Sequence, residues 1–164
     1  MKSNPVLPAC ALALAGLPLA AAAGSVGAER GAYLARIMDC AGCHMPMGPD
    51  GAPDAAAGLS GGTFGFEVPG FGIVWPPNLT PDETGLGSWS DAEIAAALTT
   101  GVRPDGRELA PVMPWRGYAG MEPDDLGALI AFLRAQPPVP GQVPPPAASG
   151  EDAAAPYFTV AMPQ

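Results

Sequence analysis

The most informative segment of this 164-residue chain is Cys40-Ala41-Gly42-Cys43-His44. Two cysteines separated by two residues and followed at once by histidine form the attachment sequence for c-type haem. The two thiols form thioethers to the porphyrin vinyl groups, and the adjacent imidazole coordinates the iron. We therefore expect Cys40 and Cys43 to bind haem covalently, with His44 as the proximal iron ligand.

Other uses of a C-x-x-C pair fit this chain less well. Zinc needs two further thiolate or imidazole ligands, but His44 is the only histidine and Cys10 is the only other cysteine. A thioredoxin-like pair requires a βαβ setting, whereas here a predicted helix precedes the pair and a Pro/Gly-rich loop follows it. The residues favour haem attachment, and the single C-x-x-C-H motif predicts one haem.

The first residues have the features of a secretory signal peptide. Lys2 supplies a positive charge, an apolar run ends near Leu19, and small residues follow it. We predict a signal peptide over residues 1–23, export to the periplasm, and loss of Cys10 with the signal. The run is shorter than the roughly 20 residues of a spanning helix, so stable membrane insertion is not expected after cleavage.

The chain is acidic, with a net charge of −9. This sign disfavours binding to nucleic acid and to anionic membrane surfaces. A basic patch on a redox partner is compatible with the charge, and so is the simpler role of keeping a small exported protein in solution.

The remaining pattern predicts an all-α domain with long loops. A first helix is expected over residues 26–39, a second between the capping box Ser90–Glu93 and Gly101, and a third from Pro123 onward. Between the first two helices, Phe64–Trp75 alternates in a way typical of a short extended ribbon around a turn.

These elements predict one domain over residues 24–138. A Pro/Ala-rich tail over residues 139–164 follows, and we expect it to be extended and poorly ordered. Tyr157–Val160 is the exception in this tail, since it is apolar enough to dock on a partner or on the domain itself.

A sixth iron ligand has to come from a residue other than histidine. Met113 lies between Pro111 and Pro114, whose fixed φ angles would stiffen the loop and hold a thioether in place. Met121 is the main alternative to Met113, and Met162 is a remote one. Three further methionines of the expected mature chain are poorly placed. Met45 and Met47 lie within about 10 Å of chain from the attachment site, and Met38 lies on the helix that leads into it.

A haem also carries two propionates, which need hydrogen-bond donors. Each candidate on its own is more often a solvated charge or a packed ring than a propionate ligand. The candidates are Arg103, Arg107, Arg116, Trp75, Trp115 and Tyr118.

Over about residues 28–138 the chain resembles mono-haem class I c-type cytochromes. It is similar, more closely, to the haem domains in cytochrome subunits of bacterial periplasmic dehydrogenases, such as those that oxidise alcohols, sugar acids or aldehydes. The resemblance rests on motifs in a fixed order: a helix with Gly31 and Tyr33, the C-x-x-C-H motif, Asn78–Asp82, Gly85-x-Gly-x-Trp89-Ser90, Met113-Pro114-Trp115 and a C-terminal helix.

The resemblance implies an all-α, class I cytochrome c-like fold around one covalent haem c, with Met113 as the distal ligand. It also implies that the first and last helices cross, with Gly31 close to the face that bears Leu129, Phe132 and Leu133. The loop Asn78–Asp82 is then expected near the haem.

The function that we expect is outer-sphere electron transfer by an iron that has both axial positions filled. Histidine and methionine together raise the reduction potential, since thioether sulfur favours Fe(II). Expected partners are a dehydrogenase as donor and an oxidase or another cytochrome as acceptor, meeting an exposed haem edge through a small interface. One alternative is a haem-bearing subunit fixed to a dehydrogenase or oxidase. Another is a haem enzyme or gas sensor with an open sixth position, which the lack of a distal histidine disfavours.

Overall fold

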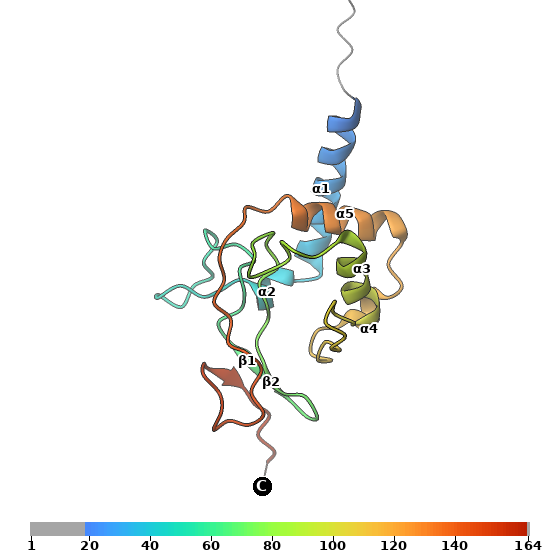
Figure 1. The fold of residues 1–164 in the computed structure, drawn as a ribbon. Helices are drawn as coiled ribbons and strands as arrows, with labels where there is room; N and C mark the ends of the chain where they lie inside the picture. Colours follow the sequence, from blue (N-terminus) through green and yellow to red (C-terminus); the bar gives the residue numbers. More distant parts are fainter. Residues whose placement is uncertain (1–18, 164) are drawn as a thin grey trace, which may run out of the picture.

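The computed structural model describes residues 19–163, which form five α-helices and three short strands (Figure 1). Most of the predicted signal peptide, including Cys10, lies outside the described residues. Within them, no helix combines the length and the apolar character needed to cross a membrane.

Two long helices cross at the top of the domain as drawn in Figure 1: α1 (Leu19–Ile37) and α5 (Pro123–Arg134). Gly31 lies at their closest approach. A Cβ added there would lie 2.0 Å from the carbonyl oxygen of Ala128 and 2.6 Å from the Cβ of Phe132. Only a residue without a side chain allows this contact, and the crossing that the resemblance implies is present.

A small apolar cluster holds the crossing together. It consists of Leu34 and Ala35 from α1 and Leu129 from α5. Leu129 is only 1% exposed. We call these three residues the crossing cluster. Met38 and Cys40 pack against its edge, so the helix pair supports the segment that enters the attachment motif.

The helix α1 ends at Ile37, two residues earlier than the sequence predicts. The reason is Asp39, whose φ of 55° lies in the left-handed region and interrupts the helical path. The chain turns there and begins α2 (Cys40–His44), a short helix that carries both motif cysteines and the histidine.

The predicted capping box starts α3 (Asp91–Thr100). The Ser90 amide donates to the Glu93 carboxylate at 2.7 Å, and the Glu93 amide donates to the Ser90 hydroxyl at 3.3 Å. Gly101 ends the helix with a φ of 73°, as expected. A further short helix, α4 (Trp115–Tyr118), follows the next loop.

The predicted ribbon is an antiparallel hairpin of β1 (Gly65–Val68) and β2 (Gly72–Val74). A third strand, β3 (Tyr157–Phe158), pairs in parallel with the other edge of β1. The strands are so few and short that the described fold is mainly helical, in agreement with the expected class.

The segment after α5 differs from the poorly ordered tail that the sequence predicts. Residues 139–159, which we call the strap, run along the domain from the end of α5 to the hairpin (Figure 1). Ala147 is 7% exposed and exchanges two backbone hydrogen bonds with Ile73, of 2.8 and 2.9 Å. These contacts use backbone groups and small residues, which leave no periodic pattern in the sequence.

Candidate haem site

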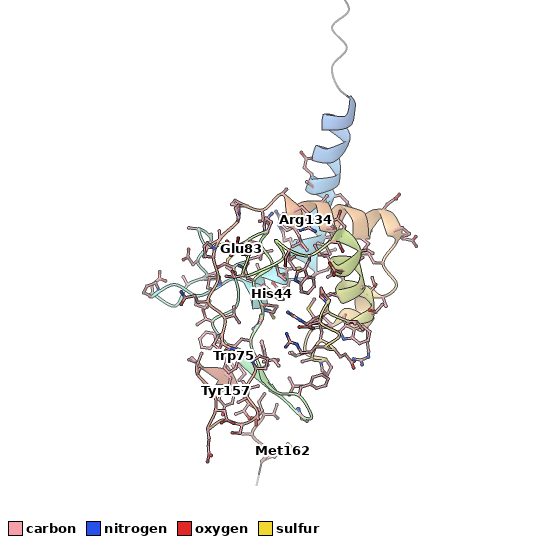
Figure 2. The ribbon with its side chains drawn as sticks, viewed as in Figure 1. His44, Trp75, Glu83, Arg134, Tyr157 and Met162 are labelled. Atoms are coloured by element: carbon pink, nitrogen blue, oxygen red, sulfur yellow. The ribbon has the colours of Figure 1, made fainter. Side chains whose placement is uncertain are left out.

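A large cavity of about 1020 Å³ opens between the α2–hairpin side of the domain and the side formed by α3 and the loop after it. Its volume is at the upper end of the range of small-molecule and cofactor sites, about 300–1,000 Å³. Figure 2 shows His44 near the middle of the molecule, beside this space. Apolar side chains dominate the walls, among them Leu86, Ile94, Leu98, Leu109, Leu129 and Leu133.

The three residues of the attachment motif all line this cavity. Cys40 and Cys43 are three positions apart in α2, and this spacing places side chains on the same face of a helix. His44 follows at the end of the same helix and is 6% exposed. The structure therefore brings together, on one wall, the residues that the motif predicts to hold a porphyrin.

The imidazole of His44 is held in a defined orientation. Its Nδ1 lies 2.7 Å from the carbonyl oxygen of Pro77, which can only accept, so Nδ1 carries the proton and Nε2 keeps its lone pair. Burial lowers the pKa of His44, and the bond to Pro77 opposes this shift only in part. The ring is thus neutral at neutral pH, which is the form that coordinates iron.

The two thiols are in an environment that suppresses thiolate chemistry. Burial raises the pKa of Cys40 and of Cys43, and the nearby Asp39 carboxylate adds to both shifts. Reactive cysteines and zinc ligands need the opposite, a lowered thiol pKa. Both sulfur atoms are therefore protonated at neutral pH, which disfavours disulfide exchange.

Met113 also lines the cavity, on the loop between α3 and α4. The loop is closed at its base, where the Leu109 amide donates to the Gly101 carbonyl at 2.7 Å. Closer to the methionine, the Met113 amide donates to Ala110 at 3.0 Å, and the Trp115 amide donates to Met113 at 2.8 Å. These backbone bonds and the flanking prolines give the thioether a rigid support.

The competing methionines lie elsewhere. Met121 packs against the crossing cluster and is not among the residues that line the cavity. Met162 is exposed near the C-terminus. Met38 does reach the cavity, but it lies two residues before Cys40 and packs on the crossing cluster. Among the methionines of residues 19–163, Met113 alone combines a cavity position with a segment distant from the attachment motif.

Arg103 has the surroundings expected of a residue that binds an acidic group in the cavity. It lines the cavity, and its Nε is buried without a hydrogen-bond acceptor in the described part of the chain. The nearest carboxylate oxygen belongs to Asp105, 3.6 Å away. Its guanidinium lies 5.2 Å from the centre of the Trp89 ring. A buried donor without an acceptor is costly, so this site fits a haem propionate.

The two tryptophans proposed as propionate donors do not face the cavity with a free N–H. Trp75 lines the cavity, but its Nε1 donates to the Pro156 carbonyl of the strap at 3.1 Å. Trp115 Nε1 is buried and has no hydrogen-bond partner within the described part of the chain, yet its ring packs against Gly101 and does not line the cavity.

Of the three remaining propionate candidates, two line the cavity and one does not. Arg107 and Tyr118 line the cavity, although Arg107 also pairs with Asp105 at 2.7 Å. Burial raises the pKa of Tyr118, so its hydroxyl stays a donor at neutral pH. Arg116 is exposed, pairs with Glu108 at 3.3 Å and does not line the cavity.

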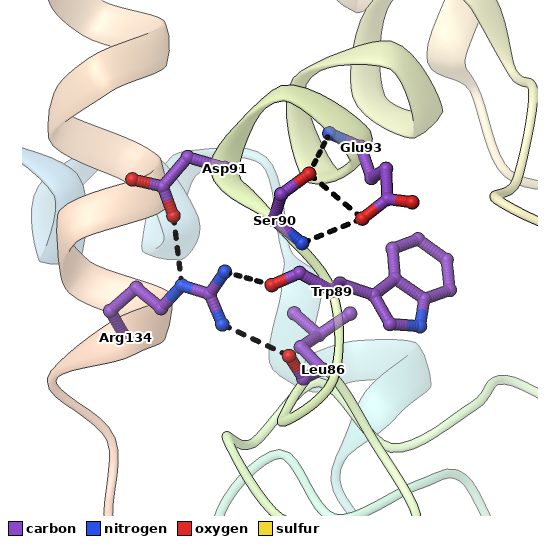
Figure 3. A network of polar contacts seen from close by, with 6 residues as sticks. All are labelled: Leu86, Trp89, Ser90, Asp91, Glu93 and Arg134. Atoms are coloured by element: carbon purple, nitrogen blue, oxygen red, sulfur yellow. Dashed lines mark hydrogen bonds and ion pairs between the residues drawn. The ribbon is translucent and has the colours of Figure 1, made fainter.

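A residue that sequence reasoning missed shapes one wall of the site (Figure 3). Arg134, in the last turn of α5, donates to the carbonyl oxygens of Leu86, at 2.9 Å, and of Trp89. Its Nε also donates to Asp91 at 2.9 Å. Leu86 and Trp89 line the cavity. An arginine in the final turn of a predicted helix is the only signal in the sequence, and it does not identify these partners.

A neutral buried imidazole and two thiols lie on one wall of an apolar cavity. This arrangement matches the chemistry of a covalently attached porphyrin. The Arg103 Nε, which has no hydrogen-bond acceptor among residues 19–163, fits the acidic groups of a porphyrin. The fold and the site together define a small, mainly helical haem protein.

Comparison with known families agrees: residues 28–137 match cytochrome c, and the chain belongs to the cytochrome c family. Members of this family bind haem c through thioethers, so the chain is a haem-bearing protein of electron transport.

Similar proteins include cytochrome subunits of bacterial dehydrogenases and a diheme cytochrome. The alcohol dehydrogenase (quinone) cytochrome c subunit of Komagataeibacter europaeus is 36% identical over 123 residues, which are 73% of this chain and 24% of that protein. The fructose dehydrogenase cytochrome subunit of Gluconobacter japonicus is 35% identical over 117 residues, 71% of this chain and 22% of the relative. A diheme cytochrome c-type protein of Cereibacter sphaeroides is 37% identical over 112 residues, 68% and 36% of the two chains. The chain thus spans 36% or less of the length of these relatives.

Proposed function

We propose that the chain is a periplasmic electron carrier with one haem c, whose iron is held by His44 and Met113. The proposal rests above all on one observation. The only histidine of the chain and Met113 line the same cavity from two segments far apart in sequence, with the two motif thiols beside the histidine.

The residues of the site fit this role. The haem, when bound, supplies an iron that alternates between Fe(III) and Fe(II). His44 offers a neutral imidazole that its bond to Pro77 already orients. A thioether from Met113 favours Fe(II), and two filled axial positions keep substrates away from the metal. The apolar walls exclude water, and this exclusion also favours the less charged ferrous state.

The number of haems and the partners are part of the proposal. One C-x-x-C-H motif supports one haem. The names of the relatives support a dehydrogenase as electron donor, with an oxidase or another cytochrome as acceptor. They equally favour a second candidate function, a cytochrome subunit held permanently on such a dehydrogenase. The signal-like residues at the N-terminus support the periplasm as location.

The axial ligands can be tested by spectroscopy of the purified holoprotein. We expect the ferric protein to show the weak far-red band of sulfur ligation and the ferrous protein to leave carbon monoxide unbound. Met113→Ala should keep the haem attached, lose this band, bind carbon monoxide and have a lower reduction potential. Met121→Ala is the matched control and should keep the band.

Two results would contradict the proposed ligation. If Met113→Ala retains the band and Met121→Ala loses it, the ligand is Met121. Rapid uptake of carbon monoxide by the unaltered ferrous protein would instead indicate an open iron, as in an enzyme or a sensor. Size-exclusion chromatography of the periplasmic extract, followed by haem absorbance, separates a free carrier from a component of a larger complex.

A further inference from the structure

Part of the cavity wall lies outside the region that matches the cytochrome c family. The family match ends at residue 137, but residues 141–146 of the strap line the cavity. The cavity described above is therefore completed by a segment that follows the family domain in sequence.

Two buried polar side chains anchor the start of the strap. Asn78 Nδ2 donates to the Val139 carbonyl at 2.8 Å, and Thr80 Oγ1 donates to the same oxygen at 3.1 Å. The Val139 amide donates back to Thr80 Oγ1 at 3.2 Å. Asn78 directly follows Pro77, the acceptor for His44, so the strap is fastened beside the support of the proposed iron ligand.

Gly141, two residues further along the strap, fits closely against the domain. The Gly141 amide donates to Thr84 Oγ1 at 3.0 Å. A Cβ on Gly141 would lie 2.0 Å from the carbonyl oxygen of Ser60, so a larger residue would force the strap outward.

The far end of the strap is anchored on the hairpin. Ala147 pairs with Ile73 through two backbone hydrogen bonds and is buried with Ile73 and Trp75 in one apolar cluster. Pro156 accepts from the Trp75 indole at 3.1 Å. Tyr157 packs on the same cluster, and Figure 2 shows it close to Trp75.

The segment between the two anchors is suited to excluding water. Residues 144–146 are three consecutive prolines that line the cavity. They have no backbone N–H to hydrate, their φ angles are fixed, and they present apolar rings. Such a wall lowers the local dielectric without adding charge.

We propose that the strap is part of the haem site: residues 141–146 form a dry wall that keeps water from the haem and raises its reduction potential. The inference rests on the haem site proposed above. Excluding water disfavours the more highly charged ferric state, and burial is one of the means by which a protein tunes haem potential.

The contact between strap and haem can be measured in the unaltered holoprotein. Val143 lines the cavity, so its methyl resonances should shift between the ferrous and the paramagnetic ferric state. Val160, which lies beyond the strap and is 82% exposed, is the matched reporter and should not shift. A Val143 resonance that is the same in both states would overturn the proposal.

Releasing the strap tests its effect on potential. Ala147→Asp places a carboxylate in the apolar cluster with Ile73 and Trp75, where an unpaired charge is strongly disfavoured. Amide exchange at Ala147 and Ile73 should accelerate roughly tenfold or more, the Val143 shift should disappear, and the potential should fall. Ala148→Asp adds the same charge at an exposed neighbour. It should leave the amide exchange, the Val143 shift and the reduction potential unchanged.

A second variant and a separate readout keep the outcomes distinct. Gly141→Ala disturbs the other anchor and should give the same changes in weaker form. Far-UV circular dichroism shows whether Ala147→Asp folds. If it does not, the Gly141→Ala variant and the Val143 shift of the unaltered holoprotein test the proposal. A released strap with an unchanged potential would overturn the proposal. A protein without attached haem would contradict the proposed function, whereas normal haem ligation with an unshifted Val143 would contradict the strap alone.

Discussion

The two sides of the haem cavity are built in different ways. On the attachment side, Cys40, Cys43 and His44 come from one short helix, so five consecutive residues determine their relative positions. On the opposite side, Met113 sits on a loop that depends on a backbone bond between Leu109 and Gly101. Local sequence therefore specifies the first side, and only the folded domain specifies the second.

The largest effect is expected on the attachment side. His44→Ala removes the only imidazole of the chain, so we expect no stable holoprotein, whereas Met113→Ala should still carry haem. Met47→Ala, at an exposed position close in sequence, is the control and should give normal yields. Haem staining after denaturing electrophoresis measures the attached cofactor. Normal recovery of coloured His44→Ala protein would show that this side does not depend on the histidine.

The helix crossing behind the attachment side offers the next test. Gly31→Ala should lower the free energy of unfolding by about 1–3 kcal/mol, the usual cost of overpacking, because the added methyl group meets α5. Gly127→Ala, on α5 with nothing within 4 Å of the added Cβ, should instead raise it by about 0.5–1 kcal/mol. Urea unfolding measures both, and equal effects would contradict the close crossing.

Arg103 provides a test of the opposite side. Arg103→Gln removes a positive charge that lines the cavity. Because a positive charge near the iron disfavours Fe(III), its removal should lower the reduction potential. Arg116→Gln is the matched control, since Arg116 is exposed and does not line the cavity. Spectroelectrochemical titration measures both potentials. A larger change in Arg116→Gln would place the propionates near Arg116 instead.

The smallest effect concerns an exposed ion pair between α1 and α5. Arg30 Nε and Nη2 donate to the Asp125 carboxylate, both at 2.9 Å, and this bond holds the pKa of Asp125 below its usual range. A lowered carboxyl pKa stabilises the fold above the unfolded value of about 3.9, and the contribution is lost as the pH falls through the folded-state pKa.

We therefore expect Arg30→Ala to lose a little stability at pH 7 and nothing once Asp125 is protonated in both states. Urea unfolding at neutral and at acid pH measures the difference. A deficit that stays constant over this range would mean that Arg30 acts through packing rather than charge.

Much of the fold was predictable where side-chain patterns repeat locally. The capping box at Ser90 and Glu93 marks the start of α3, and Pro123 marks the start of α5. The alternating aromatic residues indicate the hairpin. The C-x-x-C-H motif predicts the residues that attach the haem, and these residues line the cavity. Each of these signals involves residues that are close in sequence, where propensity and spacing suffice.

The contacts that the sequence did not reveal are those made by backbone groups over long distances. The acceptor for His44 is the carbonyl of Pro77, and the acceptor for Trp75 is the carbonyl of Pro156. Every residue has such a carbonyl, so nothing in the sequence marks these two. The same holds for Ala147, whose burial depends on the small sheet and not on its own hydrophobicity.

The strap has a consequence for the order in which the molecule assembles. Its contacts join residues 81 and 92 positions apart, Trp75 with Pro156 and Glu67 with Thr159. Closing such long loops costs more entropy than forming helices, so we expect the strap to settle after the helices have packed. We therefore expect the porphyrin to reach the two cysteines before residues 141–146 take their place along the cavity.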